Sequence, residues 1–347
     1  MSDHTTTKYD KSHVTHWKVR IQDPRRRHAV ATRRKVEKAI RAFFDAKNFE
    51  EVRTPLLVVS PGMEPHIRPL PLKNNLYLPT SPEFAMKKLL AGGLNKIYQI
   101  CPAFRDEPHS TTHLREFTLL EWYETQIDDQ GLQKTTEQLI EALAIQLFGK
   151  PEITFQGKKI SVKTPWPRLR TRNLFLETVG IDLVKNHSVE LLAQECRRLK
   201  IQTDASDTWD DLYFKIWLNL IEPKLPENQA VFVTRYPASQ AALSRLDQDP
   251  DGSQWAKRFE VYIGGIELAN AFEELTDPVE QRKRFVDDMD LREKTYGPSF
   301  PKSPIDEDFI AALEQGLPPC SGIAMGVDRL VMLFANESDI DYTFYIT

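Results

Sequence analysis

The chain of 347 residues carries 46 basic and 50 acidic side chains, which gives a formal charge of −4. A hydrophobic share of 41% is ordinary for a globular protein and excludes collagen-like and wholly disordered classes. The longest uninterrupted apolar run, residues 330–335, is far shorter than the ~20 residues that a membrane span needs. Three scattered cysteines without a CxxC pair are typical of the reducing cytoplasm and predict neither a disulfide framework nor a zinc site. The small net charge disfavours a general binder of polyanions.

The first 27 residues are polar, and we interpret them as an N-terminal tail that leads into a helix. The basic residues of the tail are Lys18, Arg20, Arg25, Arg26 and Arg27. They are expected to form a solvated basic face, with a partner-docking patch as the alternative. Apolar residues at helical spacing then predict a helix over 28–47, followed by a strand over 50–59 that Pro55 interrupts.

The middle of the chain alternates short strands with helices. We expect strands at 76–78, 97–105, 116–124, 153–155 and 159–162, and helices at 82–91 and 131–149. A polar loop, 106–115, joins the second and third of these strands. Residues 164–222 are mainly helical in pattern, and we interpret them as an insertion or minor lobe.

Strands resume after this insertion, at 230–234, 258–263 and 266–272, and Gly264-Gly265 predicts a tight hairpin between the last two. Helices are expected from 278 to about 297 and over 307–315, and a strand or turn then leads into a final helix ending near 335. Strands clustered at 97–124 and 230–272 favour an antiparallel α+β fold over a parallel βαβ ladder.

The first hairpin carries side chains that could bind a nucleotide. Strand alternation places Phe117, Glu121 and Tyr123 on one face, and Arg105 shares parity with Glu107 at the mouth of the loop. An arginine fork suits phosphate, and an aromatic ring suits stacking on a base. A surface ion pair beside half-buried aromatic rings is the alternative interpretation.

The second hairpin brings carboxylates together. Counting outward from Gly264-Gly265 pairs Tyr262 with Glu267 and Glu260 with Ala269, so that Glu260 and Glu267 share one face. Paired carboxylates suit Mg²⁺ that bridges phosphates, and an exposed acidic edge is the alternative. Asn270 has the opposite parity to Glu267 and would join the same face only through a bulge.

The C-terminal segment SGIAMGVDRLVML places glycines before a helix, where they allow a ligand to approach the backbone closely. Arg329, in the first turns of that helix, could be a surface charge or a phosphate ligand. This pattern alone does not decide between these two roles of Arg329.

Taken in order, the segments resemble the class II aminoacyl-tRNA synthetases. The helix through Phe43-Phe44 up to Pro55 resembles their motif 1, which forms the dimer interface in that family. FRDE with REFTLLEWYE at 104–124 resembles motif 2, and GVDRLVML at 326–333 resembles motif 3. TSPEFAMKKLL at 80–90 and RFEVYIGGIELANAFEEL at 258–275 resemble the lysyl branch. The resemblance implies a class II catalytic domain over residues 28–347.

The resemblance also implies roles for matching positions. Arg105 and Arg329 would be catalytic, holding the α- and γ-phosphates of ATP. The implied ATP site comprises Arg105, Asp106, Glu107, His113, Leu114, Phe117, Glu267, Leu268, Gly326 and Arg329. The implied amino-acid site comprises Ser81, Pro82, Glu83, Glu121, Tyr123, Asn270, Phe272, Glu274 and Ala324. Glu260 and Glu267 would hold Mg²⁺. Such an acidic pocket suits a substrate with two ammonium groups.

Within the lysyl branch, the sequence resembles the paralogues that modify elongation factor P. Motif 1 begins near residue 28, so we expect no anticodon-binding OB domain, which needs roughly 80 residues. Ala324 and YPASQAALS at 236–244 also resemble the ligase version of the motifs. This predicts a cytoplasmic homodimer that activates lysine or (R)-β-lysine as an adenylate and transfers it to elongation factor P, without tRNA. The alternatives are a truncated synthetase that charges tRNA and a non-catalytic binding or sensing paralogue.

Four residues depart from the family pattern. Leu114 and Arg115 replace Asn-Pro, Asp106 replaces Asn, and Ala271 replaces Gly. Leu114 removes a side-chain contact to ATP, and Ala271 adds a methyl group beside the substrate pocket.

Overall fold

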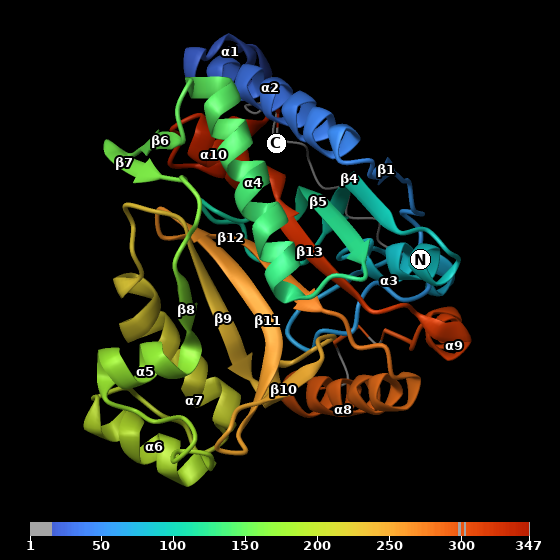
Figure 1. Cartoon of the computed structure of the whole chain (residues 1–347), viewed down its shortest axis with the longest axis vertical. Helices are drawn as coiled ribbons and strands as arrows, with labels where there is room; N and C mark the ends of the chain where they lie inside the picture. Colours follow the sequence, from blue (N-terminus) through green and yellow to red (C-terminus); the bar gives the residue numbers. More distant parts are fainter. Residues whose placement is uncertain (1–15, 298–299, 302, 347) are drawn as a thin grey trace, which may run out of the picture.

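The computed structural model describes residues 16–297, 300–301 and 303–346. Its centre is a nine-stranded sheet in the order β1-β4-β5-β13-β12-β11-β9-β8, with β10 paired to β11 (Figure 1). The pairs β1–β4 and β8–β9 are parallel, and the other strand pairs of this sheet are antiparallel, which confirms the expected antiparallel α+β architecture. Its strands are β1 (Glu50–Glu51), β4 (Lys96–Phe104), β5 (Glu116–Thr125), β8 (Arg168–Arg170), β9 (Val231–Pro237), β10 (Leu246–Gln248), β11 (Gln254–Ile263), β12 (Ile266–Glu273) and β13 (Cys320–Gly326).

Two small sheets accompany the large one. They pair β2 (Leu70–Pro71) with β3 (Tyr77–Leu78) and β6 (Glu152–Phe155) with β7 (Lys158–Ser161). The strand expected over 50–59 is much shorter than its pattern suggested, because β1 ends before Pro55 and most of the following residues are irregular. No helix in the described ranges is long and apolar enough to cross a membrane.

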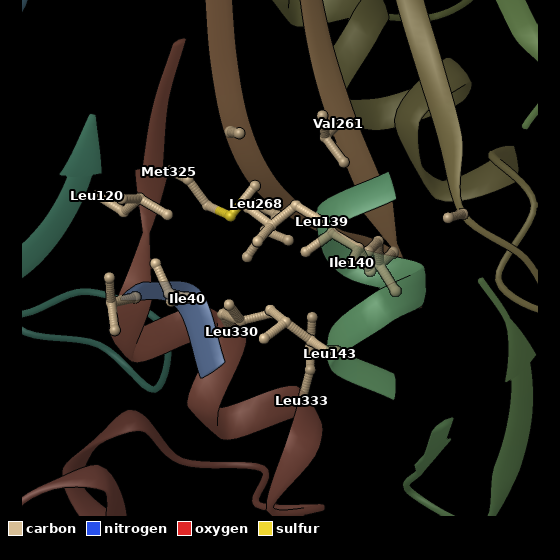
Figure 2. Packing of buried hydrophobic residues seen from close by; sticks show 14 of the residues in the cluster. Ile40, Leu120, Leu139, Ile140, Leu143, Val261, Leu268, Met325, Leu330 and Leu333 are labelled. Carbon is tan, nitrogen blue, oxygen red and sulfur yellow. The ribbon is translucent and has the colours of Figure 1, made fainter. Parts of the chain in front are cut away.

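One face of the sheet is covered by the long helices α2 (Pro24–Ala46) and α4 (Asp129–Phe148) and by α10 (Val327–Phe334). The main core lies between these helices and the sheet. Figure 2 shows Ile40 of α2, Leu139 of α4 and Leu330 of α10 packing with Leu120 and Met325 from two adjacent strands. These apolar contacts hold the sheet rigid, and its opposite face is available for polar side chains.

Lys18, Arg25 and Arg27 of the basic N-terminal segment are exposed, as expected, but the segment is helical and one of its arginines is buried. Residues 16–27 are largely helical, because α1 (His16–Gln22) precedes α2, and Asp23 caps α2 by accepting from the backbone N–H of Arg25. Arg26 lies on the buried face of α2 and donates to the backbone carbonyls of Asp341 and Phe344. At least this cation therefore holds the C-terminal segment in place. Residues 1–15 lie outside the described part of the chain.

The other face of the sheet and its ends carry further helices. Near β4 and β5 lie α3 (Glu83–Ala91), α8 (Pro278–Tyr296) and α9 (Glu307–Gly316), around a small core that contains Phe84, Phe285 and Phe309. Short 3-10 turns include η5 (Ala238–Gln240) and η6 (Ile340–Thr343).

Residues 164–222 are mainly helical, as their pattern predicts, and this helical lobe packs around a second core. It contains α5 (Thr171–Val179), α6 (Val189–Arg198) and α7 (Trp209–Ile216), and a π-helical turn follows α7. Phe175, Tyr213 and Trp217 stack inside it, so these aromatic rings form part of its core. This lobe packs on β9 and β11.

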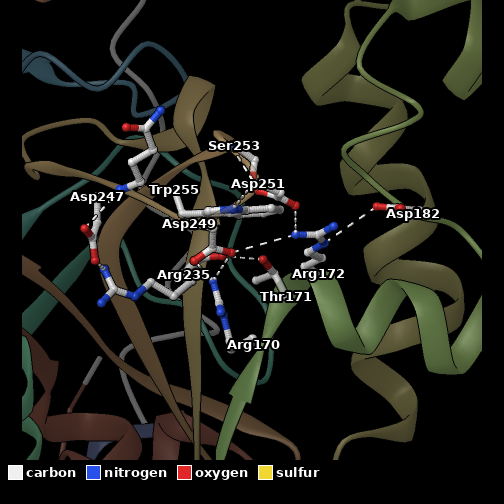
Figure 3. Close-up of polar contacts among 11 residues, drawn as sticks. Arg170, Thr171, Arg172, Asp182, Arg235, Asp247, Asp249, Asp251, Ser253 and Trp255 are labelled. Atoms are coloured by element: carbon white, nitrogen blue, oxygen red, sulfur yellow. Dashed lines mark hydrogen bonds and ion pairs between the residues drawn. The ribbon is translucent and has the colours of Figure 1, made fainter.

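Ion pairs tie the start of this lobe to the β10–β11 hairpin (Figure 3). Arg170 Nη2 lies 2.7 Å from Asp249 Oδ2, and Arg172 Nη1 lies 2.6 Å from Asp251 Oδ2. Arg172 Nε also lies 3.6 Å from Asp182 within the lobe. Partly exposed ion pairs contribute little energy each, but this network links the lobe to the sheet that carries the site.

Candidate active site

A cavity of about 380 Å³ lies over the face of the sheet opposite the main core. Leu119, Glu121 and Tyr123 of β5 line it, whereas Leu120 and Trp122 are buried in the main core. The alternation expected for this strand is therefore confirmed. Ala324 of β13 and Asn270 of β12 also line the cavity. They are the register neighbours of Glu121, because Glu121 pairs with Ala324 and Ala324 pairs with Asn270.

Most of the expected site residues meet in this cavity. Those that line it are Ser81, Glu83, Arg105, Glu107, His113, Leu114, Phe117, Glu121, Tyr123, Glu267, Leu268, Asn270, Phe272, Ala324, Gly326 and Arg329. Four others do not line it: Pro82, Asp106, Glu260 and Glu274. The Asp106 carboxylate instead lies 3.2 Å from Arg68 Nε and 3.6 Å from Arg115 Nε. Glu260 and Glu274 are buried, with 7% and 1% of their surface exposed.

The register of the second hairpin corrects one expectation. Tyr262 pairs with Glu267 as expected, but Glu260 pairs with Asn270 and not with Ala269. The cause is a β-bulge at Leu268, whose side chain packs into the main core (Figure 2). The bulge reverses the parity after Glu267, which brings Glu267 and Asn270 into the same cavity. It also turns Ala271, which we expected beside the substrate pocket, into the main core.

Two arginines dominate one end of the cavity. The Arg105 guanidinium lies 5.1 Å from the centre of the Phe117 ring, and its buried Nε has no hydrogen-bond partner. Arg329 Nη1 donates to the carbonyl of Glu267 at 2.7 Å, and Nη2 lies 2.7 Å from His113 Nε2. Burial and the nearby Arg329 lower the pKa of His113, which keeps this ring neutral. An unpartnered guanidinium N–H beside an aromatic ring suits a nucleotide phosphate and base.

Arg329 is positioned by the residue before it. Asp328 is buried, forms an ion pair with Arg33 of α2, and accepts from the backbone N–H of Thr118 at 2.7 Å. This contact fixes the start of α10 against both α2 and β5. Asp328 therefore has a structural role, whereas the next residue, Arg329, faces the cavity.

The two expected metal carboxylates lie close together but in different surroundings. Glu260 Oε1 lies 2.6 Å from Arg258 Nη2, and Glu260 Oε2 accepts from Tyr236 at 2.6 Å and from Tyr262 at 2.9 Å. Glu267 faces the cavity, and desolvation followed by the charge of Glu260 raises its pKa to about 7. A cation would relieve this repulsion, so the oxygen-only pair fits Mg²⁺. The described ranges contain no cluster of three metal-binding side chains, so further ligands would come from phosphate or water.

The other end of the cavity is lined by the acidic side chains of Glu83 and Glu121, and Glu83 is paired with a buried lysine. Glu121 accepts from Ser81 at 2.5 Å and from Tyr123 at 3.1 Å. Lys87 Nζ lies 2.6 Å from Glu83 Oε1 and 2.5 Å from Glu274 Oε2. Lys87 therefore links the cavity-lining Glu83 to Glu274, which does not line the cavity.

Burial changes the protonation of these groups. Desolvation, followed by the charge of Glu83, raises the pKa of Glu121 to about 8. Desolvation also raises the pKa of Glu274 to about 8, although Lys87 opposes this change. For Lys87, desolvation favours the neutral amine, but Glu274 and Glu83 outweigh it and raise the pKa. An empty pocket of this kind favours a ligand that brings additional positive charge.

Three residues of the site were missed in the sequence. Lys87, one helical turn after Glu83, has the spacing of a surface ion pair, and only its burial reveals its place in the pocket. Arg258 connects Glu260 to Asn270, whose Oδ1 accepts from Arg258 Nε at 3.0 Å. Gly322 leaves space for Tyr123, since an added Cβ would lie 2.1 Å from the ring. A glycine inside a strand is the signal that could have identified it.

Comparison with known proteins identifies the sequence family. Residues 10–345 match the family of class II tRNA synthetases for D, K and N. A lysine–tRNA ligase of Pelotomaculum thermopropionicum is 38% identical over 328 residues, which are 92% of this chain and 63% of that protein. Lysine–tRNA ligases of Coxiella burnetii, 36% identical, and Carboxydothermus hydrogenoformans, 35% identical, match 90% and 92% of the chain. The chain spans less than two thirds of the length of these relatives, 63% and 65% for the last two.

Proposed function

The chain belongs to the class II tRNA synthetase family of D, K and N enzymes, and from this premise we propose that it is an ATP-dependent ligase for lysine or (R)-β-lysine. The acyl group would pass through an aminoacyl-adenylate to the ε-amine of a lysine on elongation factor P. The observation that carries the activation step is that the acidic side chains of Glu83 and Glu121 line the same cavity as Arg105 and Arg329.

In the proposed activation step, the substrate carboxylate attacks the α-phosphorus of ATP. A new P–O bond forms, the bond to the β-phosphate oxygen breaks, and pyrophosphate leaves. Arg105 and Arg329 would neutralise phosphate charge, and Phe117 would stack on the base. Glu260 and Glu267 would hold Mg²⁺, which supplies further neutralisation of the phosphates when bound. No nucleophile from the protein is required.

In the proposed transfer step, an acceptor amine attacks the carbonyl carbon of the adenylate. An amide C–N bond forms, the C–O bond to phosphate breaks, and AMP leaves with the electron pair. The acceptor ammonium loses two protons overall, which pass to solvent. Ala324 and residues 236–244, which resemble the ligase version of the motifs, support elongation factor P as the acceptor.

A second candidate keeps the same activation step and charges tRNA. The names of the relatives, all lysine–tRNA ligases, favour it. One experiment separates the two candidates: the purified chain is incubated with ATP, labelled lysine or β-lysine, and either elongation factor P or tRNA. Label on elongation factor P, detected by mass spectrometry as an added acyl mass, supports the first candidate. Label on tRNA alone contradicts it, and a lack of lysine- or β-lysine-dependent ATP–pyrophosphate exchange contradicts both.

A further inference from the structure

The helical lobe contributes one wall of the cavity that none of the expected site residues occupies. Asp210 and Phe214, one turn apart on α7, both line the cavity. Asp210 Oδ1 accepts from Ser239 Oγ at 2.8 Å and from Gln240 Nε2 at 2.9 Å, so the carboxylate is held in place by the η5 turn. An aromatic ring beside an oriented carboxylate suits a side chain with an aliphatic stem and a positively charged end.

Gln240 supplies an independent indication of a ligand. It lines the cavity, it is only 7% exposed, and its buried Oε1 has no hydrogen-bond partner. Because Nε2 donates to Asp210, the atom left unpartnered is an acceptor. A buried unpaired acceptor is unfavourable, and beside the Asp210 carboxylate a donor N–H that carries positive charge would satisfy it best.

This wall belongs to the same cavity as the implied amino-acid site, and Arg258 links the two. The Gln240 carbonyl accepts from Arg258 Nη1 at 3.2 Å, and Arg258 Nε donates to Asn270, which lines the pocket. Another stretch of the same cavity wall carries Glu64 and Asp288, two further carboxylates. A cavity wall of this charge attracts cations and repels phosphates.

We propose that Asp210 and Gln240 bind the ammonium group of an acceptor lysine side chain, with Phe214 against its methylene chain. This inference rests on the proposed function and names the acceptor as a cationic protein side chain. A polyanionic RNA end is disfavoured by the same carboxylates.

The test measures binding of Nα-acetyl-lysine amide by ligand-observed NMR. A lysyl-sulfamoyl-adenosine analogue first fills the nucleotide and amino-acid sites, so that the probe competes for neither. We expect the wild type to bind the probe but not its neutral counterpart, Nα-acetyl-norleucine amide. Asp210→Asn should weaken binding at least fivefold, and Gln240→Met, which removes the unpartnered acceptor, should weaken it in the same direction. Asp290→Asn, an exposed acid of α8 that does not line the cavity, is the matched control and should bind as the wild type does.

A transfer assay distinguishes failure of this inference from failure of the proposed function. ATP–pyrophosphate exchange and trapping of the adenylate by hydroxylamine, a small neutral nucleophile, should change less than twofold in Asp210→Asn. Transfer to Nα-acetyl-lysine amide should fall at least tenfold. Equal probe binding by the wild type and both cavity variants would overturn the inference, as would transfer to tRNA that falls as much as transfer to the probe. Lack of analogue binding by the wild type would instead contradict the proposed function.

Discussion

Lys87 Nζ lies 2.5 Å from Glu274 Oε2, and both side chains are only 1% exposed. The same ammonium group lies 2.6 Å from Glu83, and Glu121 is in the same pocket without a cation of its own. When all four groups are ionised, three negative charges face one positive charge. A substrate with two ammonium groups would neutralise the difference, whereas an amino acid with one would leave a buried charge unpaired.

Lys87→Met should destabilise the protein, because it removes the cation that the buried Glu83 and Glu274 share. Breaking a buried ion pair on one side costs about 3–5 kcal/mol. We expect a loss of this size in the free energy of unfolding, measured by urea denaturation near pH 8. Lys283→Met on the surface of α8, where the side chain is 69% exposed, is the matched control and should change it by less than about 0.5 kcal/mol. Equal losses for the two variants would contradict a buried charge cluster.

Substrate binding should release protons at pH 7. The pKa of Glu121 and that of Glu274 are both raised to about 8, so both carboxyl groups are mostly protonated in the empty pocket. The ammonium groups of lysine favour the ionised carboxylates, so up to roughly two protons should leave per lysine bound. Calorimetry at pH 7 in buffers of different ionisation enthalpy measures this number. It should fall toward zero above pH 9, and Glu121→Gln should reduce it; uptake of protons would contradict the assignment.

The same groups give the stability of the empty protein a defined pH dependence. A carboxyl group with a raised pKa binds more protons in the folded state than in the unfolded state between its model value of 4.5 and about 8. The free energy of unfolding should therefore decrease as the pH rises through this window. Glu121→Gln should flatten the decrease when thermal unfolding is followed from pH 5 to pH 8.5. An unchanged slope would show that Glu121 is ionised throughout.

The parity of β5 and the pairing of Tyr262 with Glu267 could be predicted, because alternation and a Gly-Gly turn are local signals. The bulge at Leu268 could not, since an apolar residue in an apolar strand carries no mark of it. The bulge alone determines whether Asn270 shares a face with Glu267. The sequence shows that Asn270 needs a bulge to share a face with Glu267, but it does not show whether the bulge forms.

Other parts of the site depend on contacts between distant segments. Asp210 and Gln240 are thirty positions apart and meet because the helical lobe packs against the end of β9. Arg26 belongs to a run of basic residues whose composition predicts a solvated surface. The C-terminal segment nevertheless buries its side chain. Neither spacing nor composition encodes such packing, whereas most of the residues that the family motifs single out do line the cavity.

Arg105→Ala should separate activity from stability. The buried Nε of Arg105 has no hydrogen-bond partner in the empty cavity. The substitution therefore breaks no hydrogen bond made by that atom. We expect the rate of ATP–pyrophosphate exchange to fall about 10²- to 10³-fold, while the melting temperature is unchanged or slightly higher. Arg198→Ala, on α6 and 50% exposed, is the control and should retain exchange. A variant that loses stability as well as exchange would indicate a structural role for Arg105.

Gly322→Ala should disable the amino-acid pocket through a single methyl group. The added Cβ would lie 2.1 Å from Tyr123 Cε1 and 2.8 Å from Glu274 Oε1, so two pocket residues would have to move. Overpacking of this kind costs about 1–3 kcal/mol, and we expect the KM for lysine in the exchange reaction to rise by at least about tenfold. Gly326→Ala provides the comparison for stability, because its Cβ would meet nothing of the protein closer than Arg329 at 3.7 Å. If Gly322→Ala binds lysine as the wild type does, then Tyr123 and Glu274 do not define the pocket, and the proposed substrate loses its main structural support.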